Sequence, residues 1–316
     1  MLKYFSKRFG LMLITFSIVI FIFFAFIHML PDYNKSLGND PLYDIIRKRE
    51  GLDKPIIIQF FYWLRNIFVS GDFGFSVHKR QSAGSVVFSK IPNTLAFQIV
   101  PYIITVPLGI MLGVVAALYK NKTADNVISV GIMVLISIPT FVLAVVFQLI
   151  FYWKLHWAPS LGVASPSEFK ANALYGISTY IMPTIVMVFG GIAGWARSIR
   201  AELTEQLTQD YMLLARSKGL SKRQAVYRHA LKNALVPFAP AIFLGFLGLI
   251  SGSIILETIF KVDGVGKVYL TAFSQKDYPV LLLNMVFFEF LGLITSILAD
   301  MSYTILDPRV RIGSGK

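Results

Sequence analysis

The sequence predicts an all-α polytopic membrane protein with six transmembrane helices, and three observations support this. Of its 316 residues, 55% are apolar and only 15% are charged, whereas soluble domains carry about 25% charged residues. The apolar residues gather in long uncharged runs, each with about the 20 residues that a helix needs to cross a ~30 Å hydrocarbon core. These runs are apolar on all sides, which excludes the alternating pattern of a transmembrane β-barrel.

The six predicted spans follow one another along the whole chain. Five runs contain no Asp, Glu, Lys or Arg, and the sixth contains only Glu289 of these; in order they are 9–30, 91–119, 126–153, 171–196, 233–256 and 278–299. The first run has 22 residues, more than the roughly 7–15 of a cleavable signal core, so we expect a retained signal-anchor helix.

Prolines recur inside the predicted spans. Each proline removes a backbone hydrogen bond, so we expect kinked helices at Pro101, Pro107, Pro139, Pro183 and Pro240. Because proline is common in membrane helices generally, both a gating role and a purely structural role stay open.

The distribution of lysine and arginine predicts the orientation in the membrane. With the N-terminus inside, 16 of the 30 basic residues lie on inner segments and only 5 in the two short outer loops. Excess positive charge stays on the cytoplasmic side, so both termini should be cytoplasmic. Topology and anionic lipid then account for the net charge of +13, and nucleic-acid binding is not expected.

The outer segment 31–94 has predicted structure of its own. Residues 55–70 are apolar and aromatic but include Arg65, which favours an interfacial helix anchored by Tyr62 and Trp63 over a seventh crossing. The glycines of 71–74 should end this helix in a turn.

The most informative segment is 197–237, which we call the coupling loop. It predicts two helices. The first has an apolar stripe and ends at Gly219 as a C′ residue; the second opens with a Ser221–Gln224 capping box and runs to about Leu235, before Pro237. The stripe consists of Leu203, Leu207, Tyr211, Leu214 and Ala215. Such a rigid cytoplasmic element suits docking of another protein, although it could instead pack only against its own helices.

Two stretches of this loop carry a family resemblance. DYMLLARSKGLS at 210–221 and RHALKNALVP at 228–237 resemble the cytoplasmic coupling motif of binding-protein-dependent ABC transporter permeases. Shorter motifs in the same order resemble the B-type permease of oligopeptide and dipeptide importers, in the peptide/nickel subfamily: GDFGFS at 71–76, IPNTL at 91–95, SIPTF at 137–141, ETIF at 257–260, DYPV at 277–280 and LDPRVR at 306–311.

The chain departs from the broad family at two points. It has Leu213-Leu214-Ala215 where the general pattern has Glu-Ala-Ala, and its interval 219–237 is longer. Both departures are similar to the peptide subfamily.

The resemblance implies a type I ABC importer permease fold. It implies a region 1–93 with the first span and an extracellular segment, a core 94–305 of five helices, and a cytoplasmic tail 306–316. It also implies that the coupling loop binds a cytoplasmic ATPase subunit through Asp210, Tyr211, Leu214, Ala215, Arg216, Lys218, Gly219 and Leu220.

The implied function is inward transport of oligopeptides or dipeptides across the cell membrane of a bacterium. The implied partners are a homologous second permease, two ATPase subunits that bind ATP and magnesium, and an extracellular peptide-binding protein docked on the outer segments. This chain should bind no cofactor or metal itself.

Motifs of other functions are missing from the sequence. Gly264 to Lys267 lacks the Ser/Thr and the spacing of a phosphate-binding loop, and there is no H-E-x-x-H or nucleophile elbow. We therefore expect no enzyme. A nickel or glutathione importer remains the alternative within the class, and a proton-coupled secondary transporter the alternative outside it.

Glu289 and Asn284 are polar residues within the sixth span. A carboxylate near the middle of a span costs roughly 3 kcal/mol and usually faces protein or water. The pair could line the translocation path or contact the second permease, or Glu289 could be a structural residue within the bundle.

Overall fold

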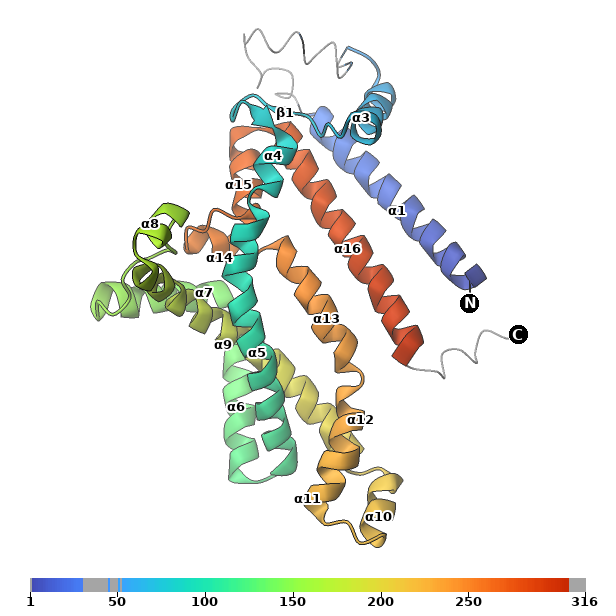
Figure 1. Cartoon of the computed structure of the whole chain (residues 1–316), viewed down its shortest axis with the longest axis vertical. Helices are drawn as coiled ribbons and strands as arrows, with labels where there is room; N and C mark the ends of the chain where they lie inside the picture. The colour runs from blue at the N-terminus through green and yellow to red at the C-terminus, as the bar shows by residue number, and fades with distance from the viewer. Residues whose placement is uncertain (1, 31–44, 46–50, 52, 307–316) are drawn as a thin grey trace. The chain divides into compact units, whose positions relative to one another are not determined.

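The computed structural model describes residues 2–30, 45, 51 and 53–306, and nearly all of them are helical (Figure 1). This confirms the all-α class. Within the predicted outer segment 31–94, residues 31–52 lie outside the described residues, apart from Ile45 and Gly51. The predicted tail 306–316, with its motif at 306–311, also lies outside them, apart from Leu306. The chain forms two compact units, one with 1–95, 250–258 and 263–316, the other with 96–249 and 259–262.

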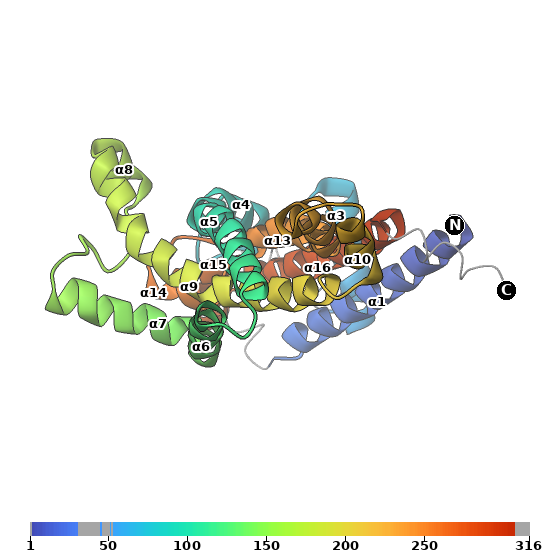
Figure 2. The same cartoon turned by 90° about the horizontal axis from the view of Figure 1, so that it is seen from below.

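The first unit is built on two long helices, α1 (Leu2–His28) and α16 (Tyr278–Leu306), which lie side by side (Figure 1 and Figure 2). Its smaller elements are α3 (Ile56–Ser70), β1 (Phe75–Ser76), β2 (Gln81–Ser82), α4 (Ala83–Phe88), α14 (Ile254–Ile259) and α15 (Val265–Gln275). β1 and β2 form a two-residue antiparallel hairpin that pairs Phe75 with Ser82. A continuous apolar core joins α1, α3, α4, α15 and α16.

The predicted interfacial helix is present as α3. Phe60 and Trp63 face the core, whereas Phe61 and Phe68 are exposed, as expected of a helix with two different faces. Gly71 caps its C-terminus with φ +62°, the left-handed conformation that glycine adopts without strain. The predicted end of this helix is confirmed; its position at a membrane surface stays a prediction.

The second unit contains most of α5 (Ile91–Leu118), which begins in the first unit. The elements that follow are α6 (Thr123–Ser137), α7 (Thr140–Phe147), the π-helix η1 (Gln148–Lys154), α8 (Pro166–Ala171), α9 (Ala173–Gln206), α10 (Asp210–Ser217), α11 (Lys222–Ala225), the π-helix η2 (Val226–Ala230), α12 (Leu231–Leu235), α13 (Phe238–Gly248) and the 3₁₀ turn η3 (Leu249–Ser251). α6 and α7 both pack on α9.

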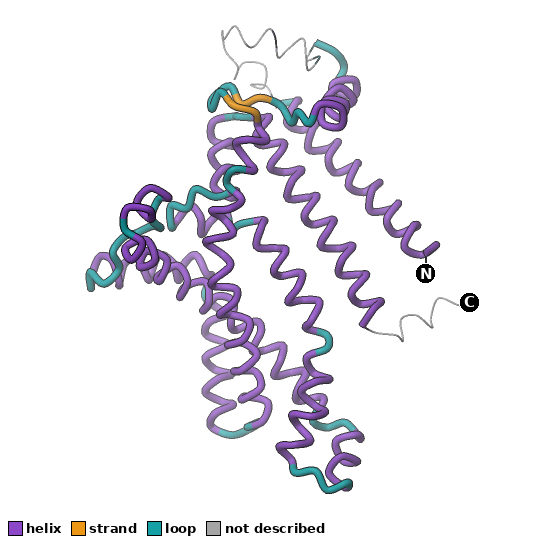
Figure 3. Tube along the Cα trace, viewed as in Figure 1, coloured by secondary structure: helices purple, strands orange, loops and turns teal. Residues whose placement is uncertain are grey.

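Four helices among the described residues are long and apolar enough to span a membrane, and two bent pairs raise the possible total to six. The expected kink at Pro139 is confirmed, and the run 233–256 also bends, but at Pro237 and not at the expected Pro240. α6 and α7 meet at 92°, because Pro139 has no N–H and forces Ile138 into extended backbone. α12 and α13 meet at 49°, with a short loop between them at Pro237 (Figure 3).

Side chains also donate hydrogen bonds to backbone carbonyls of other segments. In the second unit, Gln98 of α5 donates to the Leu249 carbonyl at 2.9 Å, and Tyr102 donates to the Ile242 carbonyl at 2.5 Å. Gln148 donates to the carbonyls of Leu161 and Ile259. Backbone groups left unpaired in hydrocarbon cost several kcal/mol, so these donors make the short helices tolerable.

Candidate functional site

The coupling loop has the two predicted parts on either side of Gly219, but the first part contains a further break that the sequence did not predict. α9 ends at Gln206, and α10 begins at Asp210 after an extended Gln209. The hydroxyl of Thr208 donates to the Glu205 carbonyl at the end of α9, and Asp210 favours a helix N-terminus. The prediction of one continuous helix through 207–209 is therefore wrong, although Leu203, Leu207, Tyr211 and Ala215 of the predicted stripe do share one apolar cluster.

The end of α10 is fixed by backbone geometry at Gly219, which has φ +89°. The N–H of Gly219 donates to the Arg216 carbonyl, and the N–H of Leu220 donates to the Ala215 carbonyl. This pair of bonds is a Schellman motif, which requires a left-handed C′ residue. The prediction of Gly219 at C′ is confirmed.

The second helical part begins as predicted. The Ser221 hydroxyl accepts from the Gln224 N–H, and the Gln224 side chain accepts from the Ser221 N–H, at 3.2 and 3.0 Å. With the Schellman motif two residues earlier, these bonds hold the turn between α10 and α11 in one conformation.

The two parts pack around a shared apolar cluster in the second unit. Its buried members come from the ends of α5 and α9, from α10, and from the helical run 222–235: Ala117, Leu203, Met212, Ala215, Ala225, Val226, Ala230 and Ala234. The alanines have no room for larger side chains, since three of them are fully buried. The loop is thus a packed element.

The opposite face of α10 presents an apolar pair to the exterior. Leu213 is 68% exposed and Leu214 is 57% exposed, so Leu214 does not lie on the buried stripe where the periodicity puts it. Asp210, Arg216, Lys218 and Gly219 are also exposed. Exposed leucines ringed by charges are typical of a protein contact.

The remaining predicted coupling residues lie on the opposite side from this face, against the apolar cluster. Ala215 is buried, and Tyr211 and Leu220 pack against the cluster. The Tyr211 hydroxyl donates to the Gln206 side chain at 2.7 Å, and Gln206 donates to Glu202 at 3.0 Å. Sequence reasoning missed Leu213, which its position beside Leu214 could have suggested.

An ion pair also missed from sequence joins α6 to α9. Arg200 donates to both carboxylate oxygens of Asp125, at 2.6 and 2.8 Å. Asp125 is buried and accepts further bonds from the Asn121 N–H and the Ser129 hydroxyl. Such a bidentate pair fixes α6 and α9 relative to each other at the start of the coupling loop.

A second polar centre lies in the first unit, around Glu257 of α14. Its carboxylate is fully buried and accepts from the Thr94 hydroxyl at 2.9 Å and from the Lys267 N–H at 3.0 Å. Thr94 in turn accepts from the Val265 N–H at 2.8 Å. The carboxylate therefore caps the first turn of α15 and ties it to the start of α5.

Burial raises the pKa of Glu257 above its usual range, because hydrogen bonds to its carboxylate offset the loss of solvation only in part. Gly252, Gly264 and Gly266 surround the carboxylate, and a Cβ at any of them would lie 2.5–3.0 Å from one of its oxygens. Three glycines flanking a glutamate within fifteen residues is a sequence signal that could have pointed to this centre.

The two polar residues of the sixth span have different surroundings. Asn284 is fully buried and donates to the Val265 carbonyl at 3.2 Å, while its side-chain oxygen has no partner among the described residues. Glu289 is partly exposed. A role for either residue in the translocation path stays a prediction.

Comparison with known families gives two matches. Residues 109–312 match the model described as the binding-protein-dependent transport system inner membrane component. Residues 1–98 match the model for the N-terminal part of the same membrane component.

Similar proteins cover the whole chain. The dipeptide transport system permease protein DppB of Lactococcus lactis subsp. cremoris (strain MG1363) is 31% identical over 99% of this chain and 100% of its own length. The glutathione transport system permease protein GsiC of Escherichia coli (strain K12) is 30% identical over 98% of this chain and 99% of its own length.

Proposed function

The chain belongs to the binding-protein-dependent transport system inner membrane component family, and from this membership and the geometry of its coupling loop we propose that it is one permease subunit of an ATP-driven peptide importer. Members of this family are multi-pass membrane permeases of ABC transporters and not enzymes. In the proposal, six spans cross the membrane with both termini inside, each bent pair counting as one span.

One observation carries the proposal: the exposed Leu213–Leu214 pair lies on a helix whose two ends and buried face are all fixed. A contact can transmit movement only if the contacting element is rigid relative to the helices it must move. α10 is held by the Schellman motif at Gly219 and by Met212 and Ala215 in the apolar cluster. Force on α10 would pass to the ends of α5 and α9.

The proposed partner at this face is an ATPase subunit with an apolar groove and acidic margins. The leucine pair would enter the groove, and Arg216 and Lys218 would face the margins. The other proposed partners are a second, homologous permease, a second ATPase and an extracellular binding protein.

The test of the coupling face is Leu214→Glu in the assembled transporter. We expect normal membrane insertion, loss of ATPase co-purification and loss of ATP-dependent uptake, because a carboxylate on this face cannot enter an apolar groove. The matched control is Ala124→Glu, an exposed position in the first turn of α6. Unchanged ATPase binding and uptake in Leu214→Glu would contradict the proposed contact.

The substrate class comes from the two relatives, one named for dipeptide and one for glutathione transport. We propose peptides, with glutathione or nickel as the alternatives. Uptake of a labelled dipeptide, an oligopeptide, glutathione and nickel by cells expressing the complex compares them directly. A complex that transports nickel alone would contradict the proposal.

The energy source needs its own experiment, because Glu289 also suits a proton-coupled carrier. Uptake should collapse when ATP is depleted and persist when an uncoupler removes the proton gradient at constant ATP. The reverse result would identify a secondary transporter.

A further inference from the structure

A polar-rimmed groove lies in the first unit between α4 and α15. Its volume is about 230 Å³. The floor is apolar and buried, formed by Val86, Val268, Ala272 and Val280, and the rim is polar, with Lys79, Gln81, Ser89, Lys90, Lys267 and Gln275. In the topology proposed above, this groove opens to the outside of the cell.

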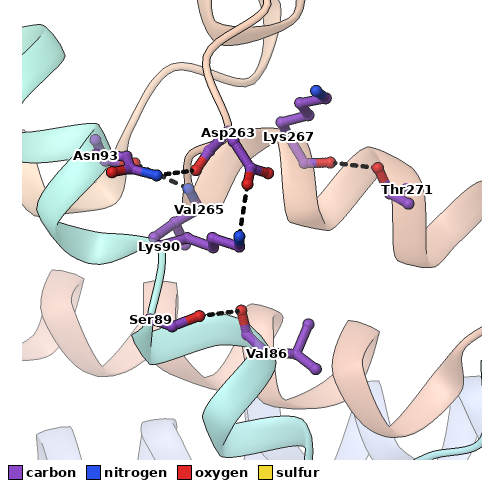
Figure 4. A network of polar contacts seen from close by, with 9 residues as sticks. Val86, Ser89, Lys90, Asn93, Asp263, Val265, Lys267 and Thr271 are labelled. Atoms are coloured by element: carbon purple, nitrogen blue, oxygen red, sulfur yellow. Dashed lines mark hydrogen bonds and ion pairs between the residues drawn. The ribbon is translucent and has the colours of Figure 1, made fainter. Parts of the chain in front are cut away.

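The rim already holds one carboxylate. Lys90 pairs with Asp263 at 2.5 Å, and Asn93 donates to the Asp263 main-chain carbonyl at 2.9 Å (Figure 4). The Asp263 side chain is 57% exposed, so a carboxylate from outside can reach the same lysine. Exposed ion pairs of this kind contribute little and exchange readily.

Of the other two rim lysines, only Lys267 lacks a carboxylate partner, because it makes no ion pair within the described part of the chain. Lys79 lies near the buried carboxylate of Asp277, which also lines the groove and accepts a hydrogen bond from Ser76. The groove therefore combines an apolar floor with a rim of three lysines and two aspartates, on which the charge of Lys267 is unmatched.

We propose that this groove receives an acidic surface segment of the extracellular substrate-binding protein, an apolar side chain of which lies on the floor while its carboxylates pair with Lys79, Lys90 and Lys267. This inference rests on the proposed function. The volume supports a protein side chain over a free peptide, because pockets that enclose small ligands measure roughly 300–1,000 Å³. Charge complementarity supports an acidic partner.

The groove is also linked to the Glu257 centre. Asp263 and Lys90 precede Val265 and Thr94 by two and four residues, and the Val265 N–H donates to the Thr94 hydroxyl. A partner that replaces Asp263 on Lys90 would therefore act on the first turns of α5 and α15. Docking at the groove could in this way shift the N-terminal ends of α5 and α15.

The test is charge reversal at Lys267 in the complete transporter, reconstituted in lipid nanodiscs with its binding protein. We expect Lys267→Glu to weaken binding-protein affinity about fivefold to tenfold and to reduce its salt dependence, since rim charges mainly affect association. ATPase activity without the binding protein should not change. Lys170→Glu in α8, an exposed lysine on the same proposed side, is the matched control and should have no effect.

A compensating change separates charge pairing from misfolding. A lysine substituted for the contacting acidic residue of the binding protein should restore affinity to Lys267→Glu and weaken affinity for the unchanged permease. Equal affinity of Lys267→Glu and the unchanged permease, with binding-protein-stimulated ATPase intact, would overturn the groove while leaving the proposed function in place. Absence of any ATP-dependent uptake would instead overturn the proposed function.

Two further measurements distinguish the binding protein from two other occupants of the groove, free peptide and this chain's own outer segment. Weaker affinity of Lys267→Glu for free peptide, measured without the binding protein, would show that the groove holds substrate. Neutralising Asp32, Asp40, Asp44 and Glu50 of the outer segment should leave binding-protein affinity unchanged; a rise in affinity would show that this chain's own segment fills the groove.

Discussion

Thr94 is the residue through which the Glu257 centre can be tested most directly. Its hydroxyl donates to one buried carboxylate oxygen and accepts from the buried Val265 N–H. Thr94→Val keeps the shape of the side chain and removes both hydrogen bonds. Thr94→Ser keeps both bonds and removes one methyl group, so the two variants separate polarity from packing.

The expected magnitudes follow from these contacts. A hydrogen bond to a charged group contributes about 1.5–3 kcal/mol, and a buried N–H left unpaired costs about 1–3 kcal/mol. Thr94→Val should lower the free energy of unfolding by about 2–5 kcal/mol on this basis. Thr94→Ser loses one buried methyl group and should cost about 1 kcal/mol.

The assay is denaturant unfolding of the purified protein in detergent micelles, followed by tryptophan fluorescence. The difference between the two variants, about 1–4 kcal/mol, measures the hydroxyl. Equal unfolding free energies for Thr94→Val and Thr94→Ser would refute the idea that this hydroxyl supports the start of α15.

The other predictions concern four further sites. Asp125→Asn should cost about 1–3 kcal/mol of unfolding free energy, since Arg200 is only partly buried, and a double variant with Arg200→Met should cost less than the sum of the two singles. Gly219→Ala should strain α10 by about 1–2 kcal/mol and uncouple ATP hydrolysis from uptake without affecting insertion; normal coupling would count against the rigid cap. Because burial raises the pKa of Glu257, the folded state binds its proton more tightly than the unfolded state, so stability should rise as the pH falls from 7 and this rise should vanish in Glu257→Gln. Glu289→Gln should leave assembly intact but alter the transport rate or its pH dependence; unchanged kinetics at every pH would favour a structural role.

Local signals in the sequence predicted the ends of helices well. The Schellman motif at Gly219, the capping box at Ser221 and the left-handed cap at Gly71 depend on residues within six positions of one another. Each uses a conformation or a hydrogen bond available to few residue types. Such features can be predicted because all their partners are close in the sequence.

Hydropathy predicted the apolar segments but not their breaks. An uncharged run such as 126–153 satisfies the length of a span whether or not the helix continues through it. Pro139 marks the place, yet Pro101, Pro107 and Pro183 lie inside α5 and α9, which the structure keeps as single helices. What differs at Pro139 is the extended backbone of the preceding residue; proline favours this conformation in the residue before it, yet the residues before the other three prolines stay helical.

Pairs distant in the sequence could not be predicted from one chain. Arg200 bonds a carboxylate 75 residues away, and Thr94 bonds one 163 residues away. No local signal distinguishes Asp125 from a solvated carboxylate, and the glycines around Glu257 mark a centre without identifying Thr94 as its partner. Their energetic importance comes from burial, which is a property of the fold.

The face of α10 that we propose for coupling depends on a helix break that periodicity did not predict. Periodicity placed Leu214 on a buried stripe continuous with Leu203, because it assumed one helix through 207–209. The break there changes the direction of α10, so that Met212 and Ala215 enter the core while Leu213 and Leu214 face outward. A helix that buried every leucine would have had no apolar surface to offer another subunit. If the proposed contact with the ATPase is right, restoring a continuous α9 through this point should abolish ATPase binding even if every exposed side chain is kept, because Leu213 and Leu214 would no longer face outward together.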